Sequence, residues 1–182
     1  DSYFTTKRTL KDMEASMVKI DTTELGIEQF NAGESISPEY ISKREISAAD
    51  VEEYHVKGMY YFDKRLGELK YRLLGIAPVI PDVNFLDEEE PGVFPLFWVF
   101  FPDARDVLHH AKAFNGKNTA IPLSFDHLLN SRRFNGYIFR EMNVQGDRAI
   151  TEYISDNALM QLLESDRIKE KIRDFEQDMW SY

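Results

Sequence analysis

The chain has 182 residues, enough for a domain that buries a hydrophobic core of its own. It carries 32 acidic and 22 basic residues, for a net charge of −10, which speaks against non-specific binding to nucleic acid or to an anionic membrane. The sequence contains no cysteine, so disulfides, thiol catalysis and cysteine-ligated metals are excluded as well.

The first third of the chain, residues 1–57, is predicted to be an acidic and loosely ordered segment with one short helix. Apolar residues at helical spacing place this helix from about Thr9 to Ile20. Between residues 21 and 57, nine acidic residues stand against three basic ones. Such a composition favours a solvated segment over a packed one.

Residues 58–182 are predicted to form an α+β core, and the clearest signal within it is a β-hairpin. Apolar and charged residues alternate on both sides of a turn that contains Gly67, in MYYFDKRLGELKYRLLGIAPVIP at 59–81. Glycine supplies the positive φ that short hairpin loops commonly need. The second strand is expected to end near Pro78 and Pro81, because proline donates no ladder hydrogen bond.

An uncharged stretch follows the acidic loop at 82–92 and predicts a strand that is apolar on both faces. It reads FPLFWVFF at 94–101, and Phe97 and Phe101 share one of the two faces. About four strands and a few short helices can cover one face of an antiparallel sheet well and the other only in part. The second face is therefore expected to lie under the C-terminal helices or, as the alternative, to bind a partner.

The remainder of the core is predicted to be helix, helix and a fourth strand. The apolar period becomes helical after Pro102, with Asp103 as a natural N-cap, and Ser124 can cap a second short helix. A strand is expected from about Phe134 to Asn143. The mostly antiparallel sheet would then have about four strands.

A C-terminal helical pair is predicted to complete the fold. Residues 150–182 have helical spacing throughout, but the leucines at 159–163 are out of phase with the apolar residues from Ile168 onward. We therefore expect a break at Ser165, which is an acceptable cap for the final helix.

No group of residues makes a positive case for catalysis, a cofactor or a metal. His109 and His110 are neighbours on a helix and point about 100° apart, and the better-spaced pair of Asp106 and His110 has only His127 as a further ligand nearby. The acids at 87–90 could serve as calcium ligands or in glycoside hydrolysis, but consecutive loop acids are usually only solvated. The sequence therefore predicts no catalytic, cofactor-binding or metal site.

Aromatic side chains are the best candidates for binding another protein. The final helix combines an apolar stripe with charges of alternating sign and ends in aromatic residues, which suit the anchor of a subunit interface. The predicted protein-interaction residues are Phe97, Phe101, Phe175, Trp180 and Tyr182.

Five stretches occur in order between residues 58 and 182: YYFDKRLGELKYRLLGIAP, PLFWVFFPDARDVL, LSFDHLLNSRRFNGYI, RAITEY and LLESDRIKEKIRDFEQDMW. Together they resemble the GldN/PorN family of the type IX secretion and gliding-motility machinery. The part before residue 58 matches weakly, and the READVxW-type segment of family members is missing. The chain therefore looks like a C-terminal core fragment of such a protein.

The resemblance implies a non-enzymatic structural protein of the periplasm that is made with a cleavable export signal. A chain that begins with Asp1 rather than Met is expected of a processed product. The resemblance further implies a homo-oligomer that forms a ring with the outer-membrane lipoprotein GldK/PorK, without inserting into the membrane itself. It also implies contact with the motor complex GldL–GldM (PorL–PorM), including its periplasmic GldM/PorM-type protein.

A function of another class remains open on the residues alone. An envelope protein that binds or processes carbohydrate or peptidoglycan could use the acids near Glu88 and exposed aromatic rings that stack on sugars. That function requires an open cleft with two carboxylates about 5 to 9.5 Å apart, or a row of ring faces.

Overall fold

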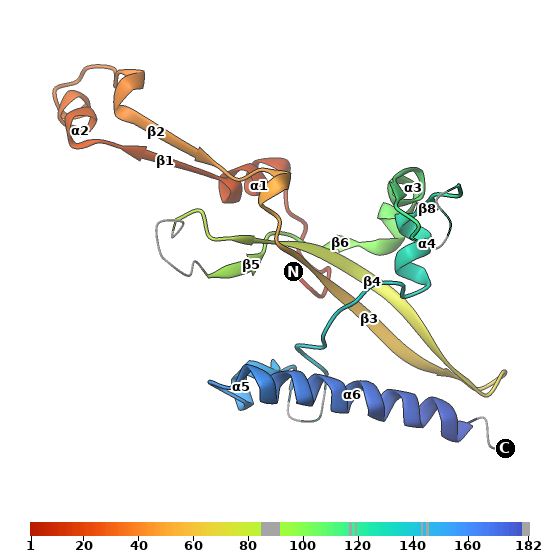
Figure 1. Cartoon of the computed structure of the whole chain (residues 1–182). Coiled ribbons are helices and arrows are strands. Elements are labelled where there is room, and N and C mark those ends of the chain that lie inside the picture. Colours follow the sequence, from red (N-terminus) through yellow and green to blue (C-terminus); the bar gives the residue numbers. More distant parts are fainter. Residues whose placement is uncertain (85–91, 117, 119, 143, 145, 180–182) are drawn as a thin grey trace. The chain divides into compact units, whose positions relative to one another are not determined.

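The computed structural model describes residues 1–84, 92–116, 118, 120–142, 144 and 146–179 (Figure 1). The chain divides into two compact units: unit 1 comprises Asp1–Gly58 and Leu73–Val107, and unit 2 comprises Met59–Arg72 and Leu108–Tyr182. The α+β class with antiparallel sheets is confirmed. The division differs from the predicted boundary between residues 57 and 58, because one long hairpin contributes residues to both units.

The N-terminal segment of unit 1 contains regular structure where the sequence predicted a loosely ordered stretch. Its elements are α1 (Leu10–Met17), β1 (Val18–Thr22), α2 (Glu24–Asn31), β2 (Ile41–Glu45) and two short 3₁₀ helices, η1 (Pro38–Tyr40) and η2 (Ala48–Asp50). Strand β1 pairs antiparallel with β2, from Val18 opposite Glu45 to Thr22 opposite Ile41. The predicted helix to Ile20 was therefore too long, since residues 18–22 pair with a strand that local periodicity does not reveal.

Helix α2 approaches the β1–β2 pair closely at Gly26, which is buried. A Cβ atom at this position would lie 2.6 Å from the Cγ2 atom of Thr22 and 3.0 Å from the Cβ atom of Tyr40. Glycine thus permits a contact between backbone and side chains that any larger residue would push apart.

The predicted hairpin is confirmed as β3 (Glu53–Asp63) and β4 (Glu68–Pro81). Its turn places Gly67 at φ +64°, and the Gly67 N–H donates to the Asp63 carbonyl over 2.8 Å. Strand β4 ends at Pro81, as expected from the missing proline donor.

The apolar stretch at 94–101 forms two short strands instead of one continuous strand. Both pair antiparallel with β4: β5 (Val93–Pro95) opposite residues 79–81, and β6 (Val99–Phe100) opposite residues 75–76. Between these pairs, β4 supplies two residues and the opposing chain three, which is a bulge that interrupts the alternation of faces. Leu96 is therefore only 5% exposed and Phe100 is 41% exposed, although strict alternation puts them on one face.

The N-terminus covers part of the apolar stretch at 94–101, at Trp98 and Phe100. The ring of Phe4 meets Trp98 edge-on, with centroids 6.4 Å apart, and packs against Phe100 at 5.3 Å. It lies over Gly75, where a Cβ atom would come within 2.3 Å of the Phe4 Cζ atom. Because Gly75 has no side chain, it leaves room for the ring of Phe4, which is distant in the sequence but belongs to the same unit.

The hydrophobic core of unit 1 joins the N-terminal segment to the sheet. A cluster of buried residues consists of Ile46, Ile80, Val83 and Leu96, with Met17, Val51, Phe94 and Phe97 packed against it. The Ile46 N–H also donates to the Met17 carbonyl over 2.9 Å. Residues from the predicted acidic segment thus belong to the same core as the strands.

Helix α3 (Phe101–His110) passes from unit 1 into unit 2. The elements that follow in unit 2 are β7 (Lys112–Ala113), β8 (Leu123–Ser124), α4 (Phe125–Asn130), α5 (Ile150–Tyr153) and α6 (Ala158–Asp178). Helix α3 begins at Phe101, so Asp103 lies in its first turn and not at the N-cap. Ser124 caps α4 as predicted, because its hydroxyl accepts a hydrogen bond from the His127 N–H over 3.2 Å.

The predicted strand from Phe134 to Asn143 is wrong for the part that the structure describes, and Asn143 itself lies outside it. This segment forms one isolated bridge, between Arg140 and Ala149. The Ile138 N–H instead donates to the Ser165 hydroxyl over 2.7 Å. A side chain on a helix satisfies this backbone group, so no neighbouring strand is needed.

The C-terminal pair of helices is present, but the predicted break at Ser165 is wrong. Helix α6 is continuous from Ala158 to Asp178 (blue in Figure 1), and the break precedes Asn157, whose side chain caps the helix. Ser165 is 1% exposed in the middle of α6. The change of apolar phase marks leucines that face outward, not an interruption of the helix.

Candidate interaction surface

The five predicted interaction residues have different environments. Phe97 is half-buried and packs against the core cluster of unit 1, and Phe101, at 3% exposure, is enclosed at the start of α3. Phe175 is 53% exposed on α6 in unit 2. Trp180 and Tyr182 lie outside the described residues. Of the three described rings, the Phe175 ring is therefore the most accessible to a partner.

Exposed leucines lead into the Phe175 region from the start of α6. Ser165 and Ile168 are buried on one face of this helix. The exposed apolar side chains, each between 48% and 67% accessible, are Leu159, Met160, Leu162 and Leu163. Apolar side chains gathered on a solvent-facing helix surface mark an interaction site more often than scattered ones do. Their signal in the sequence is the change of apolar phase between residues 159–163 and Ile168.

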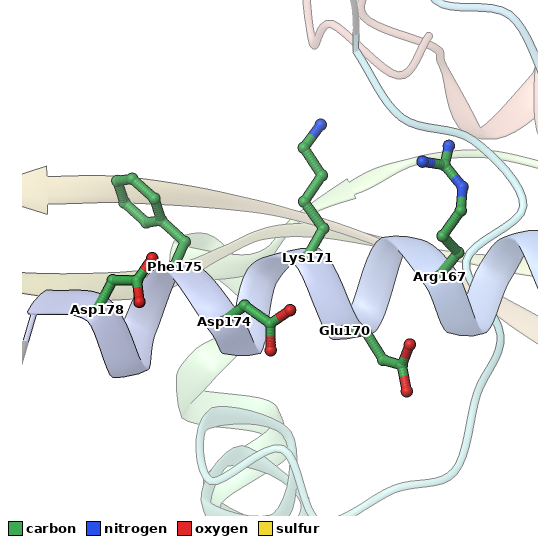
Figure 2. A pocket seen from close by; sticks show the side chains of 6 residues that line it. All are labelled: Arg167, Glu170, Lys171, Asp174, Phe175 and Asp178. Atoms are coloured by element: carbon green, nitrogen blue, oxygen red, sulfur yellow. The ribbon is translucent and has the colours of Figure 1, made fainter.

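A shallow and widely open groove continues this surface along α6 (Figure 2). It is lined by two rows of residues at i, i+4 spacing, with Arg167, Lys171 and Phe175 in one row and Glu170, Asp174 and Asp178 in the other. Figure 2 shows Arg167 and Lys171 on one side of the helix axis and Glu170 and Asp174 on the other. A groove between two such rows has the shape that a ridge of side chains on another helix fills.

The charges along the groove differ in how far the chain already neutralises them. Glu164 accepts a hydrogen bond from the Arg167 Nε atom over 2.8 Å, and this bond lowers the pKa of the Glu164 carboxyl below its usual value. Glu170 lies 3.5 Å from Arg173, measured from carboxylate oxygen to guanidinium nitrogen. Lys171 and Asp174 form no hydrogen bond or ion pair with any residue that the structure describes. These two charges are available to a partner.

The candidate metal and acid sites gain no support. The rings of His109 and His110 are 6.0 Å apart and nearly perpendicular, so their nitrogens do not converge. Within the described residues, no three His, Asp or Glu side chains are placed to hold a metal ion. The acids at 87–90, Glu88 among them, lie outside the described part of the chain.

Arg132 forms a polar and aromatic contact inside unit 2 with two tyrosines of the hairpin. Its Nη1 atom donates to the Tyr60 hydroxyl over 2.8 Å, and its guanidinium lies 5.4 Å from the centre of the Tyr71 ring. The two tyrosine rings are 5.0 Å apart, and burial raises the pKa of Tyr71. The end of α4 is thereby fastened to the β3–β4 hairpin.

Replacing Arg132 by alanine is expected to lower the free energy of unfolding by about 1–2 kcal/mol, because a cation–π contact and a hydrogen bond are lost together. The stability of Arg132→Lys should lie between that of the unaltered chain and that of Arg132→Ala, since lysine keeps the charge but not the planar guanidinium group. Urea unfolding followed by circular dichroism measures both changes. Arg133→Ala is the control, because Arg133 is an exposed neighbour of the same type. An equal loss of unfolding free energy in the two alanine variants would count against the contact of Arg132.

The amino-acid sequence matches a known protein family over almost its whole length. The family model described as "Gliding motility associated protein GldN" matches residues 1–181. No curated protein matches the chain. The family match includes residues 1–57, whereas the resemblance in the sequence lies between residues 58 and 182. Membership of residues 1–57 in the same domain family agrees with the position of Ile46 in the core cluster. Among the described residues, no helix has both the length and the apolar character needed to cross a membrane.

Proposed function

The chain belongs to the GldN family of gliding-motility proteins, and on this basis we propose that it is a non-enzymatic structural subunit of the type IX secretion and gliding-motility machinery. It acts in the periplasm, where it assembles with an outer-membrane lipoprotein of the GldK/PorK type into a ring. It also contacts the GldM/PorM-type protein of the motor complex. The observation that carries this proposal is the family match over residues 1–181.

Exposed apolar residues support an assembly role in each unit taken by itself. In unit 1, α2 leaves Leu25, Ile27 and Phe30 between 49% and 67% exposed. In unit 2, the leucines of α6 and Phe175 are exposed to a similar degree. Contacts with neighbouring subunits would remove this apolar surface from water, which is the main favourable term in most protein association.

The proposal predicts that the chain binds a purified GldK/PorK-type lipoprotein, freed of its lipid, in a particle larger than one copy of each. Light scattering after size-exclusion chromatography measures the mass with and without the lipoprotein. A particle of many copies is the expected result. A strict monomer that ignores the lipoprotein would overturn the proposal.

The same binding assay tests the aromatic C-terminus. The double variant Trp180→Ala, Tyr182→Ala should bind the lipoprotein at least about tenfold more weakly, because truncating aromatic anchors commonly costs more than 1–2 kcal/mol. Phe114→Ala is the matched control, since Phe114 is an exposed aromatic residue elsewhere in unit 2. Capture of the lipoprotein by the double variant at the strength of the unaltered chain would remove the C-terminus from the interface.

A further inference from the structure

We propose that the α6 groove, lined by Arg167, Glu170, Lys171, Asp174, Phe175 and Asp178, binds α6 of a second copy of this chain in antiparallel orientation. The two copies are then related by a two-fold axis, so each residue contact occurs twice. This pairing goes beyond the proposed function, because assembly with a lipoprotein does not require it.

The order of charges along the groove is complementary to its own reverse. From the N-terminal side it reads positive, negative, positive, negative, at Arg167, Glu170, Lys171 and Asp174. When two such helices run antiparallel and cross between residues 170 and 171, Arg167 of one copy faces Asp174 of the other. Glu170 then faces Lys171 in the same way. A parallel pair in register would place equal charges opposite one another, which is unfavourable.

In the antiparallel pair, apolar side chains lie on both sides of this charged centre. Leu159 and Leu163 continue the row of Arg167, Lys171 and Phe175 at i, i+4 spacing. In the antiparallel pair, Phe175 falls about one turn from Leu162 and Leu163 of the second copy. Contact of Phe175 with these two leucines, at each end of the interface, adds a hydrophobic contribution to the ion pairs.

The shape of the groove and its free charges also fit a second helix. Rows at i, i+4 spacing interdigitate when two helices pack, and the 21 residues of α6 offer about 30 Å of contact length. Lys171 and Asp174 have no partner among the described residues. Their partners in the second copy, Glu170 and Arg167, already contact Arg173 and Glu164, so each would share its charge between two contacts.

Two single charge reversals test the pairing. Lys171→Glu places an acid opposite Glu170 of the second copy, and the symmetry repeats this repulsion, so self-association should weaken at least tenfold. Glu170→Lys should have the same effect through two lysines facing each other. An equimolar mixture of the two variants restores both ion pairs and should associate within about threefold of the unaltered chain. Sedimentation velocity on the full chain over a concentration series measures each case.

The orientation is tested separately, because the chain has no cysteine of its own. A mixture of Arg167→Cys and Asp174→Cys chains should form the mixed disulfide in preference to either symmetric one under mild oxidation. Preference for the symmetric disulfides would overturn the antiparallel arrangement.

Three results would overturn the pairing as a whole. They are a chain that stays monomeric at all concentrations, an unaltered association in Lys171→Glu, and no recovery in the mixture. Loss of lipoprotein capture by Lys171→Glu in a chain that does not self-associate would assign the groove to the lipoprotein instead. If the chain self-associates as expected but ignores the lipoprotein, the pairing stands and the proposed ring function fails.

Discussion

Substituting Ile80 by alanine is expected to lower the free energy of unfolding of unit 1 by about 2–5 kcal/mol. Ile80 is completely buried on β4 and contacts Ile46, Val83 and Leu96 in the core cluster. The substitution removes apolar contacts and leaves a cavity that close-packed neighbours can fill only in part. It also loosens residues 1–57 from the sheet, because Ile46 belongs to the same cluster.

Tryptophan fluorescence can follow this change in unit 1. The chain has two tryptophans, so a Trp180→Phe background leaves Trp98 as the only reporter, next to Phe4 in unit 1. Ile20→Ala is the matched control, because Ile20 is 63% exposed on β1 and should change stability by less than about 1 kcal/mol. If both variants unfold at the same urea concentration, the cluster around Ile80 does not form the core.

Hydrogen exchange on the Ile80→Ala chain separates an integrated N-terminal segment from a loosely ordered one. Amides of β1 and β2 should lose protection together with those of β4, since the segment and the sheet share one cluster. A segment that is solvated on its own, as its charge predicts, would show no difference between the two chains.

Elements set by local signals could be predicted from the sequence. The β3–β4 hairpin follows from alternation and a positive-φ glycine at its turn, and the cap of α4 follows from one serine before an apolar helical run. These signals act within a few residues, so no knowledge of the rest of the fold is needed.

Elements set by distant contacts could not be predicted. Strand β1 exists because residues 18–22 pair with residues 41–45, and the composition of the intervening stretch suggests only solvation. The bulge at 96–98 depends on how β5 and β6 both align with β4. Likewise, the position of the Phe4 ring depends on the space that the missing side chain of Gly75 leaves, and the two residues are far apart in the sequence.

The candidate surface was located only in part, for a reason that the aromatic residues illustrate. Ring size alone does not distinguish a core residue from an interface anchor, because both gain free energy when their area leaves water. Phe101 proved to be buried and Phe175 exposed, although both follow the apolar pattern of their elements. The exposed leucines of α6 give no separate signal in the sequence, because the phase change that they cause fits a break between two helices equally well.

Ser165→Ala is expected to lower the free energy of unfolding of unit 2 by about 1–3 kcal/mol. Ser165 is 1% exposed in α6, and its hydroxyl accepts a hydrogen bond from the Ile138 N–H over 2.7 Å. Without it, a partly buried amide loses its acceptor and residues around 138 lose their attachment to the helix. The effect opposes helix propensity, since alanine favours an internal helix position over serine by up to about 0.5 kcal/mol.

This opposition makes the sign of the result informative. A net loss of stability, seen by urea unfolding, would mean that the contacts of the hydroxyl outweigh the gain in helix propensity, and faster hydrogen exchange at Ile138 would attribute the loss to the missing hydrogen bond. Asp166→Ala is the control one residue along the helix, where the exposed ion pair with Lys169 at 3.3 Å contributes less than about 1 kcal/mol. A more stable Ser165→Ala chain with unchanged exchange at Ile138 would mean that this serine is only an ordinary helix residue and that another contact holds the 134–140 segment.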